Sequence, residues 1–211
     1  MASKVAVVTY SLIAVNILVF SVQFFDPIYY EHLVLNYSLI PAHVLEGRNL
    51  FTVITSMFLH ANLIHLGMNM LFLLISGDGC ERAMGNSRFL VFYLACGILA
   101  GLFHTYMNST SVTPTIGASG AIFGVLAAFA IMFPFRWLIS LFGLIPIPVP
   151  AILFVFIEIF SETALVASGT VDYIAHTAHL GGFLAGVFLI LLFGPRKREL
   201  EQQSLAKETT R

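Results

Sequence analysis

One serine, set between two glycines, is the residue of this chain best suited to act as a nucleophile. Ser119 lies in the sequence Gly-Ala-Ser-Gly at 117–120, which opens an apolar run that Pro134 and Arg136 end. The run has 17 residues, from 117 to 133. At 1.5 Å per residue it reaches ~25 Å into a bilayer core of ~30 Å, so we expect Ser119 to lie below the membrane surface. Small residues also serve plain helix packing, an alternative that this tetrapeptide alone leaves open.

A histidine at the same depth could activate this serine. Ser119 and His179 are each the first of 15 residues that lead to the inner ends of their runs, at Phe133 and Phe193. Both therefore lie ~22 Å above the inner face. A serine hydroxyl is a weak nucleophile until a base takes its proton, and neutral imidazole is the usual base near pH 7. We predict that Ser119 is a nucleophile and that His179 is its general base.

A third apolar run brings two more polar side chains to this layer. His65 and Asn69 open stretches of 16 and 12 residues that end at Cys80, which correspond to ~24 Å and ~18 Å of helix. Their spacing of four places both on one helix face. Together with the backbone N–H of Ser119, they are the available donors for an oxyanion. The alternative is a polar layer that only joins helices, but such layers seldom need several histidines.

No acidic residue is expected to join the layer. The nearest acids, Glu162 and Asp172, are assigned to the outer end of the run at 149–165 and to the loop after it. We therefore predict a serine–histidine dyad without a third carboxylate. Glu158 and Glu162 share a helix face, and outer-end solvation with one packing hydrogen bond accounts for both. The alternative for Glu158 is that it helps to set an opening between the second and fifth spans.

Composition and hydropathy indicate that these residues belong to an all-α membrane protein. The chain has 211 residues, of which 58% are hydrophobic and 10% charged, and its mean hydropathy is +0.92. The first apolar run is interpreted as a retained span, and residues 26–60 as short interfacial helices. We predict a six-transmembrane-helix bundle in one domain, 1–195, followed by a short polar tail, 196–211. The spans cover about 5–25, 61–80, 89–107, 117–133, 149–165 and 176–193.

The basic residues predict the orientation of this bundle. Nine of them fall on one side of the six-span arrangement and only Arg48 on the other, so both termini are expected in the cytoplasm and the polar layer near the outer side. Scattered basic residues and a net charge of −1 argue against nucleic-acid binding. Cys80 and Cys96 are interpreted as packing residues, and no metal or cofactor is expected. The nine are Lys4, Arg82, Arg88, Arg136, Arg196, Lys197, Arg198, Lys207 and Arg211.

Three groups of residues together form a specific pattern. The first is Gly-Ala-Ser-Gly-Ala at 117–121 with Phe-Gly at 123–124, and the second is Ala-His-Thr-Ala-His-Leu-Gly-Gly at 175–182 with Gly186. The third group consists of His60, His65, Asn69, Glu81 and Gly85. In these residues the chain resembles the rhomboid family of intramembrane serine proteases, and the resemblance covers about 55–194.

The resemblance implies a minimal, prokaryotic-type bundle with a water-accessible site that opens outward. In it Ser119 is the nucleophile and His179 the base, and His65 with Asn69 stabilises the oxyanion. The implied partners are transmembrane segments of membrane-protein substrates and the lipid bilayer, while the oligomeric state stays open. The Trp-Arg pair that many relatives have in the first loop is missing. Site support is implied for Gly117, Gly120, Phe123, His176, Gly182 and His60.

Three other functions fit parts of the pattern. A membrane metalloenzyme would need ligands, and the candidates are His60, His65, His176 and His179. The chain lacks a His-Glu-x-x-His motif, and no well-placed carboxylate ligand is expected. A rhomboid-like protein without protease activity would bind client helices, but such relatives usually lack the serine or the histidine. A transporter would need more intramembrane acids than the two on the fifth span.

Overall fold

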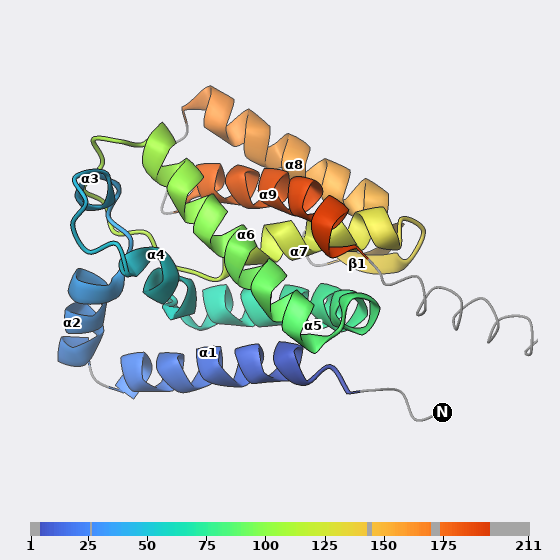
Figure 1. Ribbon diagram of the computed structural model, residues 1–211, viewed down its shortest axis with the longest axis horizontal. Helices are drawn as coiled ribbons and strands as arrows, with labels where there is room; N and C mark the ends of the chain where they lie inside the picture. The colour runs from blue at the N-terminus through green and yellow to red at the C-terminus, as the bar shows by residue number, and fades with distance from the viewer. Residues whose placement is uncertain (1–4, 26, 143–144, 170–173, 195–211) are drawn as a thin grey trace, which may run out of the picture.

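Six apolar helices form the body of the molecule. The computed structural model describes residues 5–25, 27–142, 145–169 and 174–194. Five helices in this part are long and apolar enough to cross a membrane, and a sixth, α7 (Ser119–Met132), is apolar but has only 14 residues. Each of the six predicted apolar runs thus contains a helix, and five of these helices are long enough to span a membrane (Figure 1). The five long helices are α1 (Val7–Phe25), α5 (Leu63–Met84), α6 (Asn86–Met107), α8 (Ala151–Ser168) and α9 (His176–Phe193).

Short helices connect α1 to α5, as the sequence predicts. Proline opens the first two of them, where its fixed φ suits a helix and its missing N–H costs no hydrogen bond. Figure 1 shows these elements gathered at one end of the long helices. They are α2 (Pro27–Tyr37), α3 (Pro41–Leu45), α4 (Thr52–Thr55) and the 3-10 helix η1 (Ser56–Phe58).

The expectation of an all-α protein is wrong in one segment. Between α7 and α8, strands β1 (Trp137–Phe142) and β2 (Ile145–Pro150) pair antiparallel at the opposite end of the molecule from α2 (Figure 1). Proline occupies every second position of β2, which excludes a helix. Trp137 pairs with Pro150 and Ile139 with Pro148. Hydrogen-bonded and non-hydrogen-bonded pairs alternate along an antiparallel ladder, and these prolines occupy the non-hydrogen-bonded pairs. Their missing N–H groups therefore cost no hydrogen bond.

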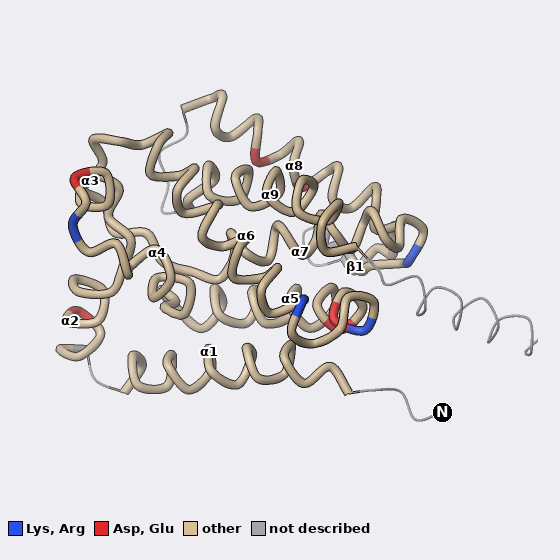
Figure 2. The backbone as a smooth tube through the Cα atoms, in the orientation of Figure 1, with Lys and Arg blue, Asp and Glu red and all other residues tan. Residues whose placement is uncertain are grey.

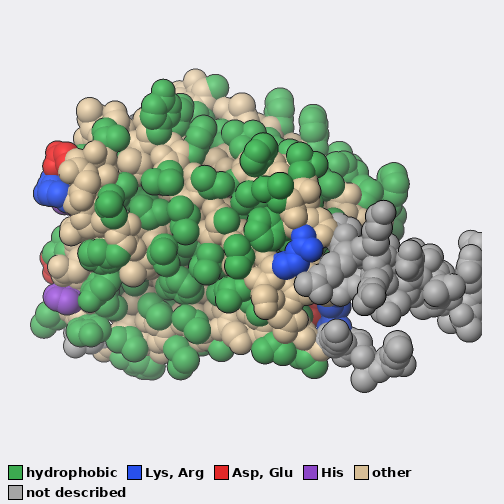
Figure 3. Space-filling model, in the orientation of Figure 1, with side chains coloured by type: hydrophobic (Ala, Val, Ile, Leu, Met, Phe, Trp, Pro, Cys, Tyr) green, Lys and Arg blue, Asp and Glu red, His purple; other side chains and the backbone are tan. Residues whose placement is uncertain are grey.

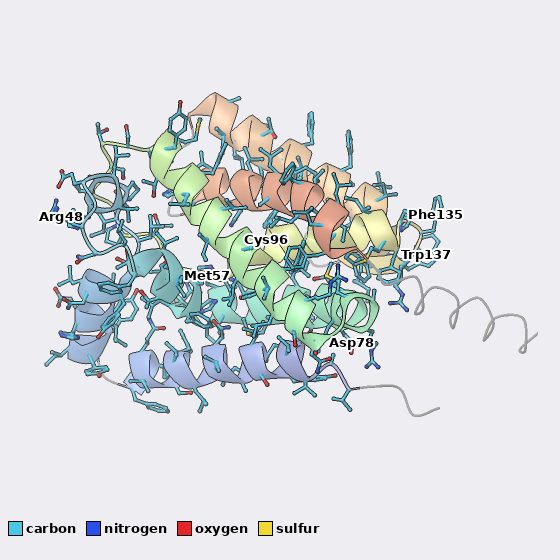
Figure 4. The ribbon with its side chains drawn as sticks, viewed as in Figure 1. Arg48, Met57, Asp78, Cys96, Phe135 and Trp137 are labelled. Atoms are coloured by element: carbon cyan, nitrogen blue, oxygen red, sulfur yellow. The ribbon has the colours of Figure 1, made fainter. Side chains whose placement is uncertain are left out.

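Apolar side chains cover the outside of the bundle, and charges collect at its ends. Figure 3 shows hydrophobic side chains spread over one whole face of the molecule. In Figure 2 the charged residues lie at the two ends, apart from acids in the middle of α8. Arg48 lies at the end opposite Asp78 and Trp137 (Figure 4). A predominantly apolar band between two charged ends is typical of a protein that spans a bilayer.

Helix α7 lies at the centre of the bundle and contacts α5, α6 and α9 (Figure 1). Most of its residues are buried, with Ala128 and Val125 fully so. Its contact with α9 depends on glycines, because a Cβ on Gly182 would overlap the carbonyl oxygen of Gly120, and one on Gly186 would overlap that of Gly124. The backbones of α7 and α9 therefore touch, which two short side chains need in order to meet across the contact.

A buried carboxylate joins α1 to the last turn of α5. Glu81 accepts hydrogen bonds from the backbone N–H groups of Val8 at 2.9 Å and Thr9 at 2.7 Å, and from the Thr9 hydroxyl at 2.7 Å. These N–H groups begin α1, where a helix favours negative charge. Gly85 follows with a φ of 84° and turns the chain directly into α6.

Candidate active site

Ser119 is the first residue of α7, and the glycine two positions earlier shapes the approach to it. Gly117 has a φ of 129°, which L side chains rarely adopt, and its N–H donates to the carbonyl of Ser56 at 2.9 Å. A Cβ on Gly117 would lie 2.9 Å from the His65 ring. Ala118 offers no side-chain cap to α7, so the N–H groups of the first helical turn remain available beside the Ser119 hydroxyl.

The Ser119 hydroxyl donates to Nε2 of His179 over 2.8 Å. His179 projects from the first turn of α9 and is only 8% exposed. The ring of Phe123, one turn after Ser119 on α7, stacks on the imidazole with centroids 4.4 Å apart and planes 8° apart. Phe123, to which the resemblance assigns site support, thus contacts the imidazole directly and holds the orientation of its ring.

A carboxylate joins Ser119 and His179 as a third member of the site, so the prediction that no acid would do so is wrong. Oε1 of Glu162, on α8, accepts from Nδ1–H of His179 at 2.9 Å. Glu162 is 8% exposed and faces the bundle interior. It lies 11 residues beyond Ala151, ~17 Å of helix above the inner end of α8, and α8 continues past it to Ser168. The count of depth that aligned Ser119 with His179 could have found Glu162 if α8 had been measured from its own inner end.

The other oxygen of Glu162 is also bound. Oε2 accepts from Nδ1–H of His176 at 2.6 Å, and the rings of His176 and His179 have centroids 6.2 Å apart. The ligand atoms of these three residues lie within 4.8 Å of one another, a donor set that suits a metal ion. Within the described part of the chain, His60 and His65 do not belong to this group. The four histidines considered as metal ligands from the sequence therefore lie in two separate places.

The two residues expected to stabilise an oxyanion lie on one face of α5. Nδ1 of His65 accepts from the N–H of Ala61 at 3.5 Å, which leaves Nε2 to carry the hydrogen, and the ring edge with Nε2 faces Gly117 beside Ser119. Asn69 is buried, and its amide donates to the His65 carbonyl at 2.8 Å. One hydrogen of the Asn69 amide is thus used within α5, and the second is left for another acceptor.

His60 lies next to His65 and is fully buried. The side chain of Gln23, from α1, holds its backbone by accepting from the N–H at 3.1 Å and donating to the carbonyl at 3.4 Å. The rings of His60 and His65 meet edge to face with centroids 5.1 Å apart. Burial, reinforced by His65, lowers the pKa of His60 to about 4. His60 is therefore neutral at physiological pH and belongs to the packing around the first loop.

A polar network that sequence reasoning missed connects α9 and the segment before α7 to α6. Nδ1 of His104 lies 2.6 Å from Oγ1 of Thr177, and its Nε2 lies 3.0 Å from Oγ1 of Thr115. Asn108 also donates to Thr177, at 2.9 Å. Thr177 lies between the two histidines of α9, and Thr115 precedes Ser119 by four residues. The only sequence signal was a histidine near the outer end of an apolar run.

A small cavity adjoins the serine on the side of α6. It has a volume of about 30 Å³, which accommodates about one or two water molecules. Small residues form much of its wall. The lining includes Ser119, Gly97, Ala100, Gly101, His104 and Ala178.

Comparison with known proteins gives this geometry a context. A family model described as the Rhomboid domain matches residues 47–196. The chain is 32% identical over 158 residues to Rhomboid protease AarA of Providencia stuartii, which covers 65% of this chain and 54% of that protein. It is 34% identical over 146 residues to the mitochondrial Rhomboid protein 1 of Saccharomyces cerevisiae, covering 64% of this chain and 40% of that protein. The chain thus spans about half the length of the curated relatives it matches.

Proposed function

The chain belongs to the rhomboid family, and on this premise we propose that it is an intramembrane serine endopeptidase. Its substrates are transmembrane helices of other membrane proteins, which it cuts near the outer side of the bilayer. The observation that carries the proposal is the 2.8 Å hydrogen bond between Ser119 Oγ and His179 Nε2. A hydroxyl and an imidazole at this distance form the nucleophile and base of acyl-transfer enzymes.

Acylation begins with Ser119. Its Oγ bonds to the carbonyl carbon of the peptide to be cut, while Nε2 of His179 takes the hydroxyl proton. His179 then gives this proton to the amide nitrogen as the C–N bond breaks, and the amine half of the substrate leaves. In deacylation a water molecule gives a proton to His179 and its oxygen bonds to the acyl carbon. Ser119 Oγ leaves as the ester breaks and regains the proton.

The oxyanion that forms in both steps needs hydrogen-bond donors. We assign this role to the backbone N–H of Ser119, to Nε2–H of His65 and to the amide of Asn69. The position of the His65 ring beside Gly117 and the available N–H groups at the start of α7 support the assignment. Because Gly117 has no side chain, it leaves room for the His65 ring beside Ser119.

A substrate helix has to unwind before it can react. Carbonyl groups within a helix are hydrogen-bonded and shielded, so substrates should carry glycine, proline or polar residues near the outer end of their span. The residue before the cut should be small. The cavity of about 30 Å³ beside Ser119, with its glycine and alanine lining, supports a small side chain at this position.

The six-span topology belongs to the same proposal. We assign α7, the fourth apolar helix in chain order, as a membrane crossing in addition to the five long helices. Its N-terminus lies below the outer surface because the helix has only 14 residues. Both termini face the cytoplasm, residues 1–195 form one domain, and the tail at 196–211 lies outside the described residues. The position of Arg48 at the opposite end from Asp78, which pairs with Arg82 at 2.7 Å, supports this arrangement (Figure 4).

Labelling with a fluorophosphonate tests the function. Such probes bond covalently to a serine only when a base activates it, so purified protein in detergent should be labelled and Ser119→Ala and His179→Ala should not. The same three proteins, reconstituted with a reporter transmembrane segment, should show cleavage by the wild type alone. Cleavage that persists in Ser119→Ala, or a wild type that neither labels nor cuts, would overturn the proposal.

A further inference from the structure

The structure places one acid of α8 where the serine–histidine pair needs a third partner. We propose that Glu162 is the positioning residue of His179, so that Ser119, His179 and Glu162 work as a triad. The inference rests on the proposed function and deepens it. It assigns to α8 a part in the chemistry that neither the sequence motifs nor the apolar pattern of that helix indicates.

Two consecutive hydrogen bonds carry the proposal. His179 accepts from Ser119 Oγ at Nε2 over 2.8 Å and donates from Nδ1 to Glu162 Oε1 over 2.9 Å. An ionised carboxylate only accepts, so Nδ1 must hold the hydrogen of the neutral ring. Nε2 is then left with its lone pair toward Ser119. This is the tautomer that a general base requires, and Glu162 selects it.

His176 fixes the carboxylate in turn. Because its Nδ1 donates to Oε2 at 2.6 Å, both oxygens of Glu162 are bound and the carboxylate plane cannot rotate away from His179. The three residues are between 7% and 8% exposed. A buried carboxylate is costly unless hydrogen bonds satisfy it, and these two meet that need. His176, which the sequence assigned only to shaping the site, thereby acquires a specific contact.

The negative charge of Glu162 also suits this role. When His179 takes the serine proton it becomes an imidazolium, and a carboxylate 2.9 Å away stabilises that cation in a site largely shielded from water. Other titratable groups surround His179 more distantly: His65 on α5, His104 on α6 and Glu158 on α8. None of these makes a hydrogen bond to His179 in the described part of the chain, so Glu162 is the partner of the imidazolium.

A comparison of the two acids of α8 separates this role from ordinary packing. Glu158 is half-buried and makes no side-chain hydrogen bond to any described residue, whereas Glu162 makes two. An acid within a membrane span usually faces the interior and marks a functional site. Glu162 faces the interior, and its hydrogen-bond partners are the base His179 and His176, one turn before it.

The test uses the rate of fluorophosphonate labelling of Ser119, because this reaction requires an activated serine but no access for a substrate helix. Glu162→Gln should lower the rate by at least ~100-fold, since loss of the triad acid in serine proteases costs on the order of 10⁴. Thr163→Val is the matched control on α8, because Thr163 is exposed and its hydroxyl donates to the carbonyl of Ile159 in the same helix. It should label at the wild-type rate.

A second readout reports the tautomer, which a merely structural role would not change. In protein with ¹⁵N-labelled histidine, the His179 signal, identified by its loss in His179→Ala, should show hydrogen at Nδ1 in the wild type. Hydrogen at Nε2 in the wild type would overturn the proposal even if Glu162→Gln fails to fold. Labelling of a folded Glu162→Gln variant at the wild-type rate would also overturn it.

The remaining outcomes distinguish this inference from its competitors. A wild type that does not label contradicts the proposed function itself, whereas a wild type that labels together with an unaffected Glu162→Gln contradicts only the triad. Labelling that EDTA abolishes and Zn²⁺ restores would show that Glu162, His176 and His179 hold a metal, and would overturn the triad as well. Labelling that EDTA leaves unchanged, with the slow Glu162→Gln reaction, supports it.

Discussion

The carbonyl oxygen of Gly120 occupies the space in which a side chain on Gly182 would begin. This contact lies one residue after Ser119 on α7 and three residues after His179 on α9. It therefore sets the separation of the two helices at the level of the site. The hydrogen bond between the serine and the histidine spans the gap that this backbone contact leaves.

Gly182→Ala should separate the two helices and stop the reaction. The added methyl group cannot be accommodated by rotating a side chain, because the atom it meets belongs to the backbone of α7. We expect a loss of about 1–3 kcal/mol in the free energy of unfolding and little or no fluorophosphonate labelling. The matched control is Gly67→Ala on α5, where a Cβ meets nothing within 4 Å. Full labelling of Gly182→Ala would contradict this account of the helix contact.

Gly117→Ala should impair the site even where the fold survives. Its φ of 129° disfavours any side chain, and the new Cβ would press on the His65 ring from 2.9 Å. Gly47→Ala separates the two effects, since Gly47 also has a positive φ, 75°, but has nothing within 4 Å of its Cβ position. Both variants should lose stability by about 1–2 kcal/mol, measured by unfolding in detergent. Only Gly117→Ala should lose cleavage of a reporter segment.

Phe123→Leu should slow the reaction by loosening the base. The stacked ring holds the His179 imidazole in its plane, and an aromatic pair is worth about 0.5–1.5 kcal/mol beyond burial. Labelling should therefore slow by up to ~10-fold. Phe160→Leu, a lipid-facing change on α8 at a residue that is 68% exposed, should leave the rate unaltered. Equal rates in the two variants would mean that the stack does not hold the base.

Thr177→Val should weaken the attachment of α9 to α6. The change keeps the shape of the side chain but removes the oxygen that Nδ1 of His104 and the amide of Asn108 contact. A buried polar group left without its partner costs about 1–3 kcal/mol, which a shift in thermal unfolding would report. Thr163→Val, with its hydrogen bond confined to α8, should unfold like the wild type. A Thr177→Val protein as stable as the wild type would argue against the network.

Protonation of His60 should destabilise the protein in acid. Burial lowers its pKa to about 4 in the folded protein, while the unfolded chain has a pKa near 6.5. Between these values the unfolded state binds more protons, so the free energy of unfolding decreases as the pH falls from about 6.5 to about 4, by about 3 kcal/mol in all. His60→Phe should lack this part of the decrease. A difference between wild type and variant that stays constant over this range would contradict the assignment.

Hydropathy and run lengths were enough to predict the apolar helices and the depth of their polar residues. Run lengths predicted the six apolar helices, and α9 begins and ends at the predicted residues, 176 and 193. The rise of a helix is a local property, so counting from the inner ends aligned Ser119 with His179 before any packing was known.

Which side chains meet at that depth depends on how the helices pack against one another. The count along a chain gives height but neither the tilt of a helix nor the neighbouring helix that a residue faces. The shared face of Glu158 and Glu162 on α8 therefore did not identify His179 as a partner. The bond of Glu162 to His179 depends on how α8 packs against α9. The same holds for the contact of Thr177 with His104, across two helices far apart in the chain. Hydrogen bonds between helices are long-range, and their partners emerge only from the packing.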